Sequence, residues 1–172
     1  MILVVSGVSG SGKTTVGALI AGRLGWRFAD ADDFHPDANI EKMRSGVPLT
    51  DADRLPWLRA VAVWMDARIA DGESAVVACS ALKRSYRDLL REGHSDSVQI
   101  VFLDVPRAEL ERRLTSRHGH FFPERLLASQ FATLERPTPD ERVLIVPVTG
   151  DVGETADRVL AAVKASGHTL GA

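Results

Sequence analysis

The chain has 172 residues, of which 45% are hydrophobic and 26% are charged, so size and composition indicate one globular domain over residues 1–172. Its 21 basic and 23 acidic side chains leave a net charge of −2, which argues against broad contact with nucleic acid or an anionic membrane. No apolar run approaches the length of a membrane span, and the single cysteine, Cys79, cannot form an internal disulfide. We therefore expect a cytoplasmic protein.

Apolar runs of strand length alternate with helical patterns along the chain. The runs at residues 2–5, 27–29, 75–79, 98–103 and 143–148 predict the strands of a buried parallel sheet. Apolar residues at helical spacing predict helices over residues 13–24, 58–69, 83–92, 107–117, 123–134 and 155–165. We expect Pro56 in the first turn of the second helix and Gly72 just beyond its end. This alternation predicts a three-layer α/β nucleoside-triphosphate fold.

The stretch "GVSGSGKTT" at residues 7–15 lies between the first predicted strand and the first predicted helix. It has the GxxxxGK[ST] spacing, which is specific in this strand-to-helix context. Backbone N–H groups of the glycines and of the helix start would converge on an anion. Lys13 would reach the β- and γ-phosphates of a nucleotide, and the Thr14 hydroxyl would bind Mg²⁺. The other residues that we expect to bind the nucleotide here are Gly7, Gly10, Ser11, Gly12 and Thr15.

A cluster of acids follows the predicted second strand, in "FADADDFHPDANIEKMRSGVPLTDADRLPW". Asp30, Asp32 and Asp33 fall within four residues, so something positive must offset their mutual repulsion. Mg²⁺ together with a polyhydroxy substrate would offset it, and a carboxylate could orient an acceptor hydroxyl and take its proton. An acidic capped loop is the alternative interpretation.

The motifs of other nucleotide-binding classes are missing or weak. A guanine-nucleotide switch would be expected to carry DxxG and [NT]KxD, and the sequence has neither. A motor-type ATPase would have an apolar strand that ends in an acid, and "VQIVFLD" ends in Asp104. Because "DVP" precedes a predicted helix, Asp104 is either a helix cap or a metal ligand.

Four segments follow one another between about residue 4 and residue 135: "GVSGSGKTT", "DADDFHPDANIEKMRSGVPLTDADRLPWL", "ACSALKRSYRDLLR" and "RHGHFFPERLLASQFATLE". Together they resemble the gluconokinase family, relatives of the shikimate kinases among the P-loop kinases. The resemblance implies ATP-dependent phosphorylation of D-gluconate on its 6-hydroxyl, giving 6-phospho-D-gluconate and ADP. It also implies a five-stranded parallel sheet in the order 2-3-1-4-5, a helical lid over about residues 117–137 and a homodimer. The exposed side of Trp57 or Trp64 could serve that dimer.

The resemblance also assigns roles to single residues. Asp32 matches the family's acceptor-side acid and is the expected general base, while Asp30 is expected to meet Mg²⁺ through water. The residues expected around gluconate, by resemblance, are His35, Arg54, Lys83 and Arg87. Ser80 follows the third strand, where open α/β sheets place ligands. A turn-capping role for His35 and a solvated helix face for Arg87 stay open as alternatives.

The segment "RRLTSRHGHFF" resembles the start of the mobile lid of this superfamily. Arg113 and Arg117 lie four residues apart, on one face of a helix. We expect Arg117 to neutralise charge on the transferring phosphoryl group, and Arg113 to pack against adenine or reach phosphate. Gly119 would let the lid close and exclude water. His120 and Gln130 match family motif residues and are expected at the substrate.

Three rival functions belong to other classes. A shikimate kinase would carry a glycine triplet after the third strand, where this sequence has "CSALK". A polynucleotide kinase would need a basic groove with aromatic platforms, and the charge balance argues against one. A non-catalytic nucleotide-binding regulator would keep the loop without needing the acceptor acid. Ala132 stands where an acid is common in the family, which argues against a lid salt bridge at that position.

Overall fold

Five parallel strands form the centre of the protein. The computed structural model describes residues 1–115 and 124–170, in which the strands are β1 (Ile2–Ser6), β2 (Arg27–Asp30), β3 (Ala75–Ala78), β4 (Val98–Asp104) and β5 (Leu144–Pro147). They lie in the order β2-β3-β1-β4-β5 and every neighbouring pair is parallel, so the predicted order is confirmed. β1 lies in the middle, with Val5 beside Ala78 of β3 and Val101 of β4.

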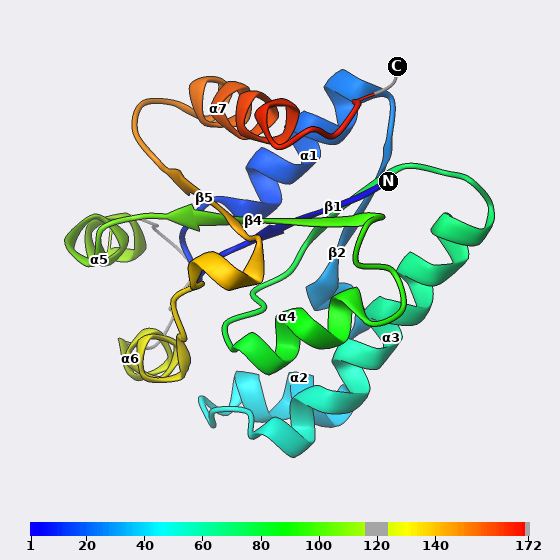
Figure 1. Ribbon diagram of the computed structural model, residues 1–172. Helices are drawn as coiled ribbons and strands as arrows, with labels where there is room; N and C mark the ends of the chain where they lie inside the picture. The colour runs from blue at the N-terminus through cyan, green and yellow to red at the C-terminus, as the bar shows by residue number, and fades with distance from the viewer. Residues whose placement is uncertain (116–123, 171–172) are drawn as a thin grey trace.

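Helices cover both faces of this sheet (Figure 1). One face carries α1 (Lys13–Leu24) and α7 (Val152–Ala165), and the other carries α3 (Asp51–Ala70) and α4 (Arg84–Arg91), with α2 (Asp37–Arg44) below them in this view. Toward the β4 and β5 side lie α5 (Arg107–Thr115) and α6 (Glu124–Thr133). Two short 3-10 helices, η1 (Ala31–Phe34) and η2 (Pro139–Glu141), follow β2 and precede β5. The predicted three-layer α/β fold is therefore confirmed.

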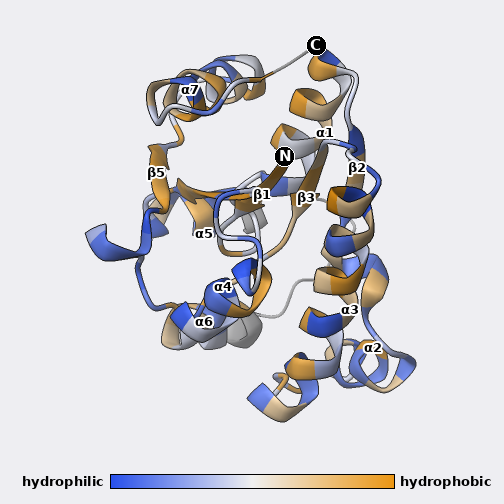
Figure 2. Ribbon diagram, turned by 45° about the vertical axis from the view of Figure 1, so that its right-hand side comes forward, coloured by the Kyte–Doolittle hydropathy of each residue, from blue (hydrophilic) through white to orange (hydrophobic). Residues whose placement is uncertain are grey.

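Successive side chains of β1 point to opposite faces of the sheet and enter two hydrophobic clusters. Leu3 and Val5 pack with apolar residues of α1 and α7. Ile2 and Val4 pack with apolar residues of α3 and α4. Figure 2 shows this centre as orange strands between helices that carry blue, hydrophilic residues. Because the central strands β1, β3 and β4 are buried from both sides, the sheet gives fixed positions to the loops that leave its carboxyl edge.

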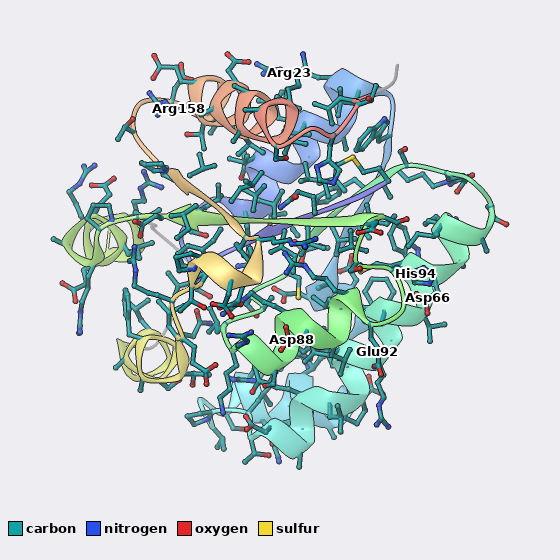
Figure 3. The ribbon with its side chains drawn as sticks, in the orientation of Figure 1. Arg23, Asp66, Asp88, Glu92, His94 and Arg158 are labelled. Atoms are coloured by element: carbon teal, nitrogen blue, oxygen red, sulfur yellow. The ribbon has the colours of Figure 1, made fainter. Side chains whose placement is uncertain are left out.

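Polar contacts between neighbouring elements lie at the outer surface. Arg23 of α1 pairs with Asp157 of α7 at 2.7 Å, and His94 lies 3.3 Å from the Asp66 carboxylate of α3. Figure 3 shows Arg23 beside α7, and His94 and Asp66 together beside α3. Exposed pairs of this kind contribute little to stability individually.

The helix α3 begins earlier than the apolar pattern indicated, at Asp51 instead of near Leu58. Its start is fixed by a capping box, in which Thr50 Oγ1 accepts from the Asp53 N–H and the Asp53 carboxylate accepts from the Thr50 N–H. The prediction that Pro56 lies in the first turn is wrong, because the first turn is formed by the residues of this box. No helix was predicted for α2, because eight residues are too few to show a clear apolar period. None of the described helices combines the length and apolarity that crossing a membrane requires.

Candidate active site

The carboxyl ends of the parallel strands meet at one edge of the sheet, beside a cavity. β1 leads into the glycine loop, β2 into η1, and β3 into the turn that begins at Cys79. In open α/β sheets this edge is where ligands bind. The cavity has a volume of about 670 Å³ and is bordered by the glycine loop, η1, α2, α3 and α6. The predicted site residues that line it are Lys13, Asp32, His35, Arg54, Ser80 and Gln130.

The glycine loop turns the chain from β1 into α1. Gly12 has a φ of 91°, in the left-handed region, immediately before Lys13 opens the helix. At Gly7, an added Cβ would lie 2.7 Å from Ser11 Oγ and 3.2 Å from the Leu103 carbonyl oxygen, so the close approach requires glycine. Ser11 Oγ is buried without a hydrogen-bond partner among the described residues. Among the described residues, no side chain caps the start of α1, where helical N–H groups can bind an anion.

Asp30 connects the glycine loop to η1. Its Oδ2 accepts a hydrogen bond from Thr14 Oγ1 at 2.7 Å, and its Oδ1 accepts one from the Asp32 N–H at 3.0 Å. A hydroxyl beside a carboxylate offers the hard oxygen ligands that Mg²⁺ prefers, so the predicted metal residues fit that ion. The Asp32 side chain is 69% exposed and lines the cavity. Asp30 therefore contacts the glycine loop, whereas Asp32 faces the cavity.

His35 lies beside Asp32 and contacts Trp57 and Asn39. Its ring stacks on Trp57, with centroids 4.2 Å apart and planes inclined by 16°, and 4% of its side chain is exposed. Nδ1 lies 3.3 Å from Asn39 Nδ2, and Nε2 lies 4.0 Å from Asp32 Oδ1. Burial lowers the pKa of His35, the Asp32 charge opposes this, and Arg54 lowers it further, so the pKa falls below its usual value. Burial therefore favours the neutral form of the ring.

Gln130 joins α6 to the glycine loop by two hydrogen bonds. Its Oε1 accepts from the Ser9 N–H at 2.7 Å, and its Nε2 donates to Ser9 Oγ at 2.9 Å. Arg54 of α3 also lines the cavity and lies over the Tyr86 ring, 5.8 Å from its centroid. Arg44 of α2 lines the same cavity. The site therefore combines an acid with cationic side chains from two helices.

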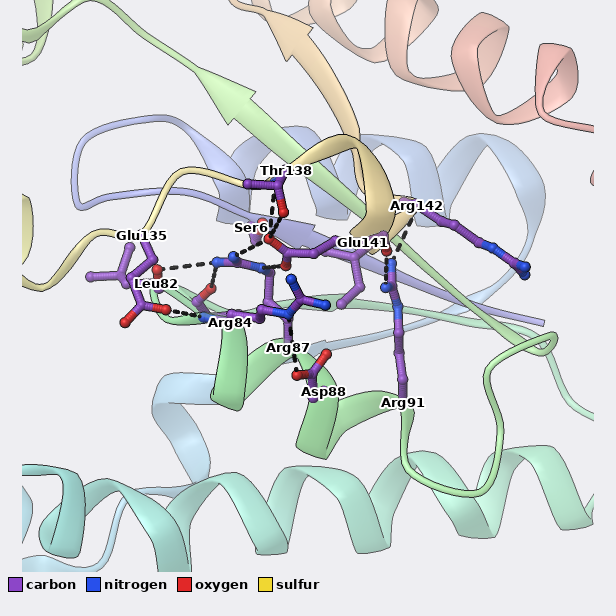
Figure 4. Close-up of polar contacts among 12 residues, drawn as sticks. Ser6, Leu82, Arg84, Arg87, Asp88, Arg91, Glu135, Thr138, Glu141 and Arg142 are labelled. Atoms are coloured by element: carbon purple, nitrogen blue, oxygen red, sulfur yellow. Dashed lines mark hydrogen bonds and ion pairs between the residues drawn. The ribbon is translucent and has the colours of Figure 1, made fainter.

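The predicted contact of Arg87 with substrate is wrong, because this side chain is completely buried. Its Nε and Nη2 donate to the Glu141 carboxylate at 2.6 and 3.0 Å (Figure 4). Its Nη1 donates to the carbonyl oxygens of Ala81 and Leu82. Burial alone would raise the pKa of Glu141, but bonds from Arg87 and Thr138 bring it below its usual value. Ala81 has a φ of 39°, so Arg87 supports a strained turn after β3.

Lys83 forms an ion pair with Asp51 and is not among the residues that line the cavity. Its Nζ donates to both carboxylate oxygens of Asp51, at 2.7 and 2.9 Å. The Tyr86 hydroxyl donates to the same carboxylate. The bond to Asp51 raises the pKa of Lys83, and bonds from Lys83 and Tyr86 lower the pKa of Asp51. Lys83 therefore joins α3 to the turn before α4, a role that the sequence analysis did not consider.

Three of the predicted lid residues, Arg117, Gly119 and His120, lie outside the described residues. Arg113 of α5 is described, and its Nε donates to Glu109 Oε1 at 2.7 Å. Bonds from Arg112 and Arg113 lower the pKa of Glu109 to about 2. The structure thus places Arg113 in an ion pair within its own helix.

A second cavity, of about 460 Å³, lies at the ends of β4 and β5 and beside α6. Asp104, at the end of β4, accepts two hydrogen bonds from Arg136 at 2.8 and 3.0 Å. The sequence left open whether Asp104 caps a helix or binds a metal. In the structure its carboxylate forms an ion pair with Arg136. Phe131 lines the second cavity while the adjacent Gln130 lines the first, so α6 borders both.

The sequence analysis missed several residues that shape the first cavity. Asn39 and Ser9 contact the predicted site residues His35 and Gln130, and the spacing of four residues between His35 and Asn39 was the available signal. Trp57 was considered only for an exposed dimer contact. That expectation is wrong, because Trp57 is 2% exposed and stacks on His35.

Comparisons with known proteins extend these observations. The family described as an AAA domain matches residues 2–137. A gluconokinase from Gluconobacter oxydans (strain 621H) is 54% identical over 144 residues, which cover 84% of this chain and 80% of that protein. Among solved structures, a gluconokinase from Sinorhizobium meliloti 1021 is 45% identical with a TM-score of 0.85, covering 95% of this chain and 91% of that chain. A sugar kinase from a Janibacter species is 48% identical with a TM-score of 0.88, covering 95% of this chain and 94% of that chain.

Proposed function

Because this chain belongs to the gluconokinase family, we propose that it phosphorylates the 6-hydroxyl of D-gluconate with ATP, giving 6-phospho-D-gluconate and ADP. The observation that carries the proposal is that Lys13 of the glycine loop and Asp32 of η1 line the same cavity. A phosphoryl donor held at Lys13 and an acceptor hydroxyl held at Asp32 would face each other there.

The transfer forms one bond and breaks one. The 6-oxygen of gluconate attacks the γ-phosphorus of ATP, the bond from that phosphorus to the bridging oxygen of ADP breaks, and the hydroxyl proton passes to the Asp32 carboxylate. Lys13 balances the negative charge on the β- and γ-phosphates. In a loose transition state the orientation of the hydroxyl matters as much as its deprotonation, and Asp32 supplies both.

The nucleotide would lie along the glycine loop, with its phosphates at the start of α1. Mg²⁺, when bound, neutralises charge on the β- and γ-phosphates. Thr14 Oγ1 would hold the ion directly and Asp30 through water, which agrees with their separation of 2.7 Å. The second cavity, lined by Phe131 and Leu134, offers an apolar place for adenine.

The rest of gluconate would extend toward α2 and α3. Arg44 and Arg54 would pair with its carboxylate, since both line the cavity and guanidinium groups match carboxylate geometry. His35, Ser80 and Gln130 would contact its hydroxyls. A ligand with a carboxylate at one end and a primary hydroxyl at the other suits this distribution of charge.

The proposal extends to the domain organisation, the lid, the oligomeric state and the cellular compartment. Residues 1–172 would form one kinase domain with a lid over about residues 117–137, which the extensive coverage of the relatives supports. Arg117 would neutralise the transferring phosphoryl group, Arg113 would contact the nucleotide, and His120 would meet the substrate. The enzyme would work as a homodimer in the cytoplasm.

A coupled assay of ADP release tests the proposal against its rivals. Purified protein with ATP and MgCl₂ should release ADP with D-gluconate and not with shikimate, a nucleoside or an oligonucleotide. Turnover with one of those acceptors instead would assign a different kinase class. Nucleotide binding without turnover on any acceptor would favour a non-catalytic regulator.

A further inference from the structure

We propose that Asn39 is a positioning residue, which holds the His35 ring in the tautomer with its proton on Nε2, so that His35 donates a hydrogen bond to the acceptor hydroxyl beside Asp32. The role of the tautomer in turnover rests on the proposed kinase function. The tautomer itself rests only on contacts within η1, α2 and α3.

The orientation of the Asn39 side-chain amide follows from a backbone contact. Its Nδ2 lies 2.9 Å from the carbonyl oxygen of Asp53 in α3, and a carbonyl oxygen only accepts hydrogen bonds. The amide nitrogen, and not the amide oxygen, must therefore occupy this position. Asn39 is 3% exposed, so exchange of this contact for water is blocked.

The second N–H of the same amide determines the protonation of His35. Asn39 Nδ2 lies 3.3 Å from His35 Nδ1, and an amide nitrogen with two hydrogens can only donate there. His35 Nδ1 must therefore accept, which means that it carries no proton. In a neutral imidazole the proton then lies on Nε2.

Neighbouring contacts restrict the rotation of the His35 ring. One face stacks on Trp57, whose Nε1 donates to the Ala31 carbonyl oxygen of η1 at 2.6 Å. The backbone N–H of His35 lies 3.3 Å from the Asp32 carbonyl oxygen. The burial that lowers the pKa of His35 also favours the neutral ring that the amide contact requires.

The proton on Nε2 faces the acid that the proposed mechanism uses. Nε2 and Asp32 Oδ1 are 4.0 Å apart, which is too long for a direct hydrogen bond. A hydroxyl oxygen about 2.8 Å from each atom fits between them, accepting from His35 and donating to Asp32. The geometry thus sets the direction of proton transfer toward Asp32 and excludes His35 as the general base.

Long-range ¹H–¹⁵N NMR of histidine-labelled protein tests this assignment without any substrate. The chain has five histidines, and the resonance lost in His35→Gln identifies this ring. At pH 8 we expect unprotonated Nδ1 and protonated Nε2. Asn39→Asp replaces the donor by an acceptor, so it should move the proton to Nδ1. Observation of Nδ1–H in the unchanged protein would overturn the proposal, even if the variant did not fold.

Kinetics test the consequence for turnover. Asn39→Asp and Asn39→Ala should lower kcat for gluconate by about 10- to 100-fold, the scale known for partners that orient metal-binding histidines, with the KM for ATP unchanged. Glu41→Gln, on the same helix and exposed, is the matched control and should change neither the NMR signature nor kcat. An altered tautomer with unchanged kcat would overturn the donor role. If the unchanged protein shows Nε2–H but does not phosphorylate gluconate, the proposed function fails while the tautomer assignment stands.

Discussion

Thr14 and Asp30 are joined by a hydrogen bond of 2.7 Å, from the hydroxyl of the glycine loop to the carboxylate at the end of β2. Through its other oxygen, Asp30 also holds the N–H of Asp32 at 3.0 Å. One acid thus links the nucleotide side of the site to the acceptor side, and the second acid faces the cavity. Substitutions of Asp30 and of Asp32 should therefore impair different steps of the reaction.

Asp32→Asn should mainly slow the chemical step. The amide keeps the size of the side chain and much of its hydrogen bonding but is not basic, so kcat should fall by about 10² to 10⁴, toward the lower end for a loose transition state. Nucleotide binding, measured by calorimetry, should stay nearly unchanged. Asp33→Asn is the matched control and should be mild. A deep loss in Asp33→Asn with little effect in Asp32→Asn would move the base by one residue.

Asp30→Asn should raise the Mg²⁺ concentration needed for half-maximal turnover. The carboxylate that accepts from Thr14 is then neutral and attracts the ion and its water less strongly. Turnover measured over a series of MgCl₂ concentrations should be partly rescued at the highest values. A loss that added metal leaves unchanged would show that Asp30 acts elsewhere in the mechanism.

Much of the fold could be predicted because its signals are local. The apolar runs of the strands and the GxxxxGK[ST] loop are continuous in sequence, and each strand lies within one residue of its prediction at either end. The start of α3 could not be predicted from apolar spacing, because its first turn is fixed by the polar pair Thr50 and Asp53.

The site was harder to predict because residue type alone does not say what a side chain contacts. Arg87 has the charge expected of a substrate residue, but its partner Glu141 is 54 residues away in the sequence and no local pattern connects them. Asn39 has no distinctive chemistry of its own. Its importance comes from two contacts: the ring of His35 is near in the sequence, but the carbonyl of Asp53 is brought to Asn39 only by the folded arrangement of α2 and α3.

Arg87→Met should lower the free energy of unfolding by about 3–5 kcal/mol, because it leaves the buried Glu141 carboxylate without its partner. Urea unfolding followed by circular dichroism measures the loss. Arg84→Met, which removes an exposed arginine from the same helix, is the control and should change stability little. A raised KM for gluconate at unchanged stability would restore Arg87 as a substrate residue.

Asp53 should make stability depend on pH. The bond from Lys42 at 2.6 Å and those from Thr50 lower the pKa of Asp53 to about 2, below its value in the unfolded chain. Its ionised form therefore stabilises the fold above about pH 4, and this contribution is lost as the pH falls toward about 2. Asp53→Asn should lower the melting temperature by a few degrees at pH 7 and by progressively less in acid. A melting-temperature difference that stays constant down to pH 2.5 would contradict this.

The position of the phosphate in the product tests the central claim most directly. The protein is incubated with ATP, MgCl₂ and D-gluconate, and the product is analysed by proton-coupled ³¹P NMR. We expect a phosphorus coupled to the two methylene protons of C6. Lys13→Ala, which should remain folded, should form this product at least about 100-fold more slowly, because it removes a preorganised charge from the transferring phosphates. Absence of the product, or a phosphorus coupled to the single proton of another carbon, would contradict phosphoryl transfer to the 6-hydroxyl.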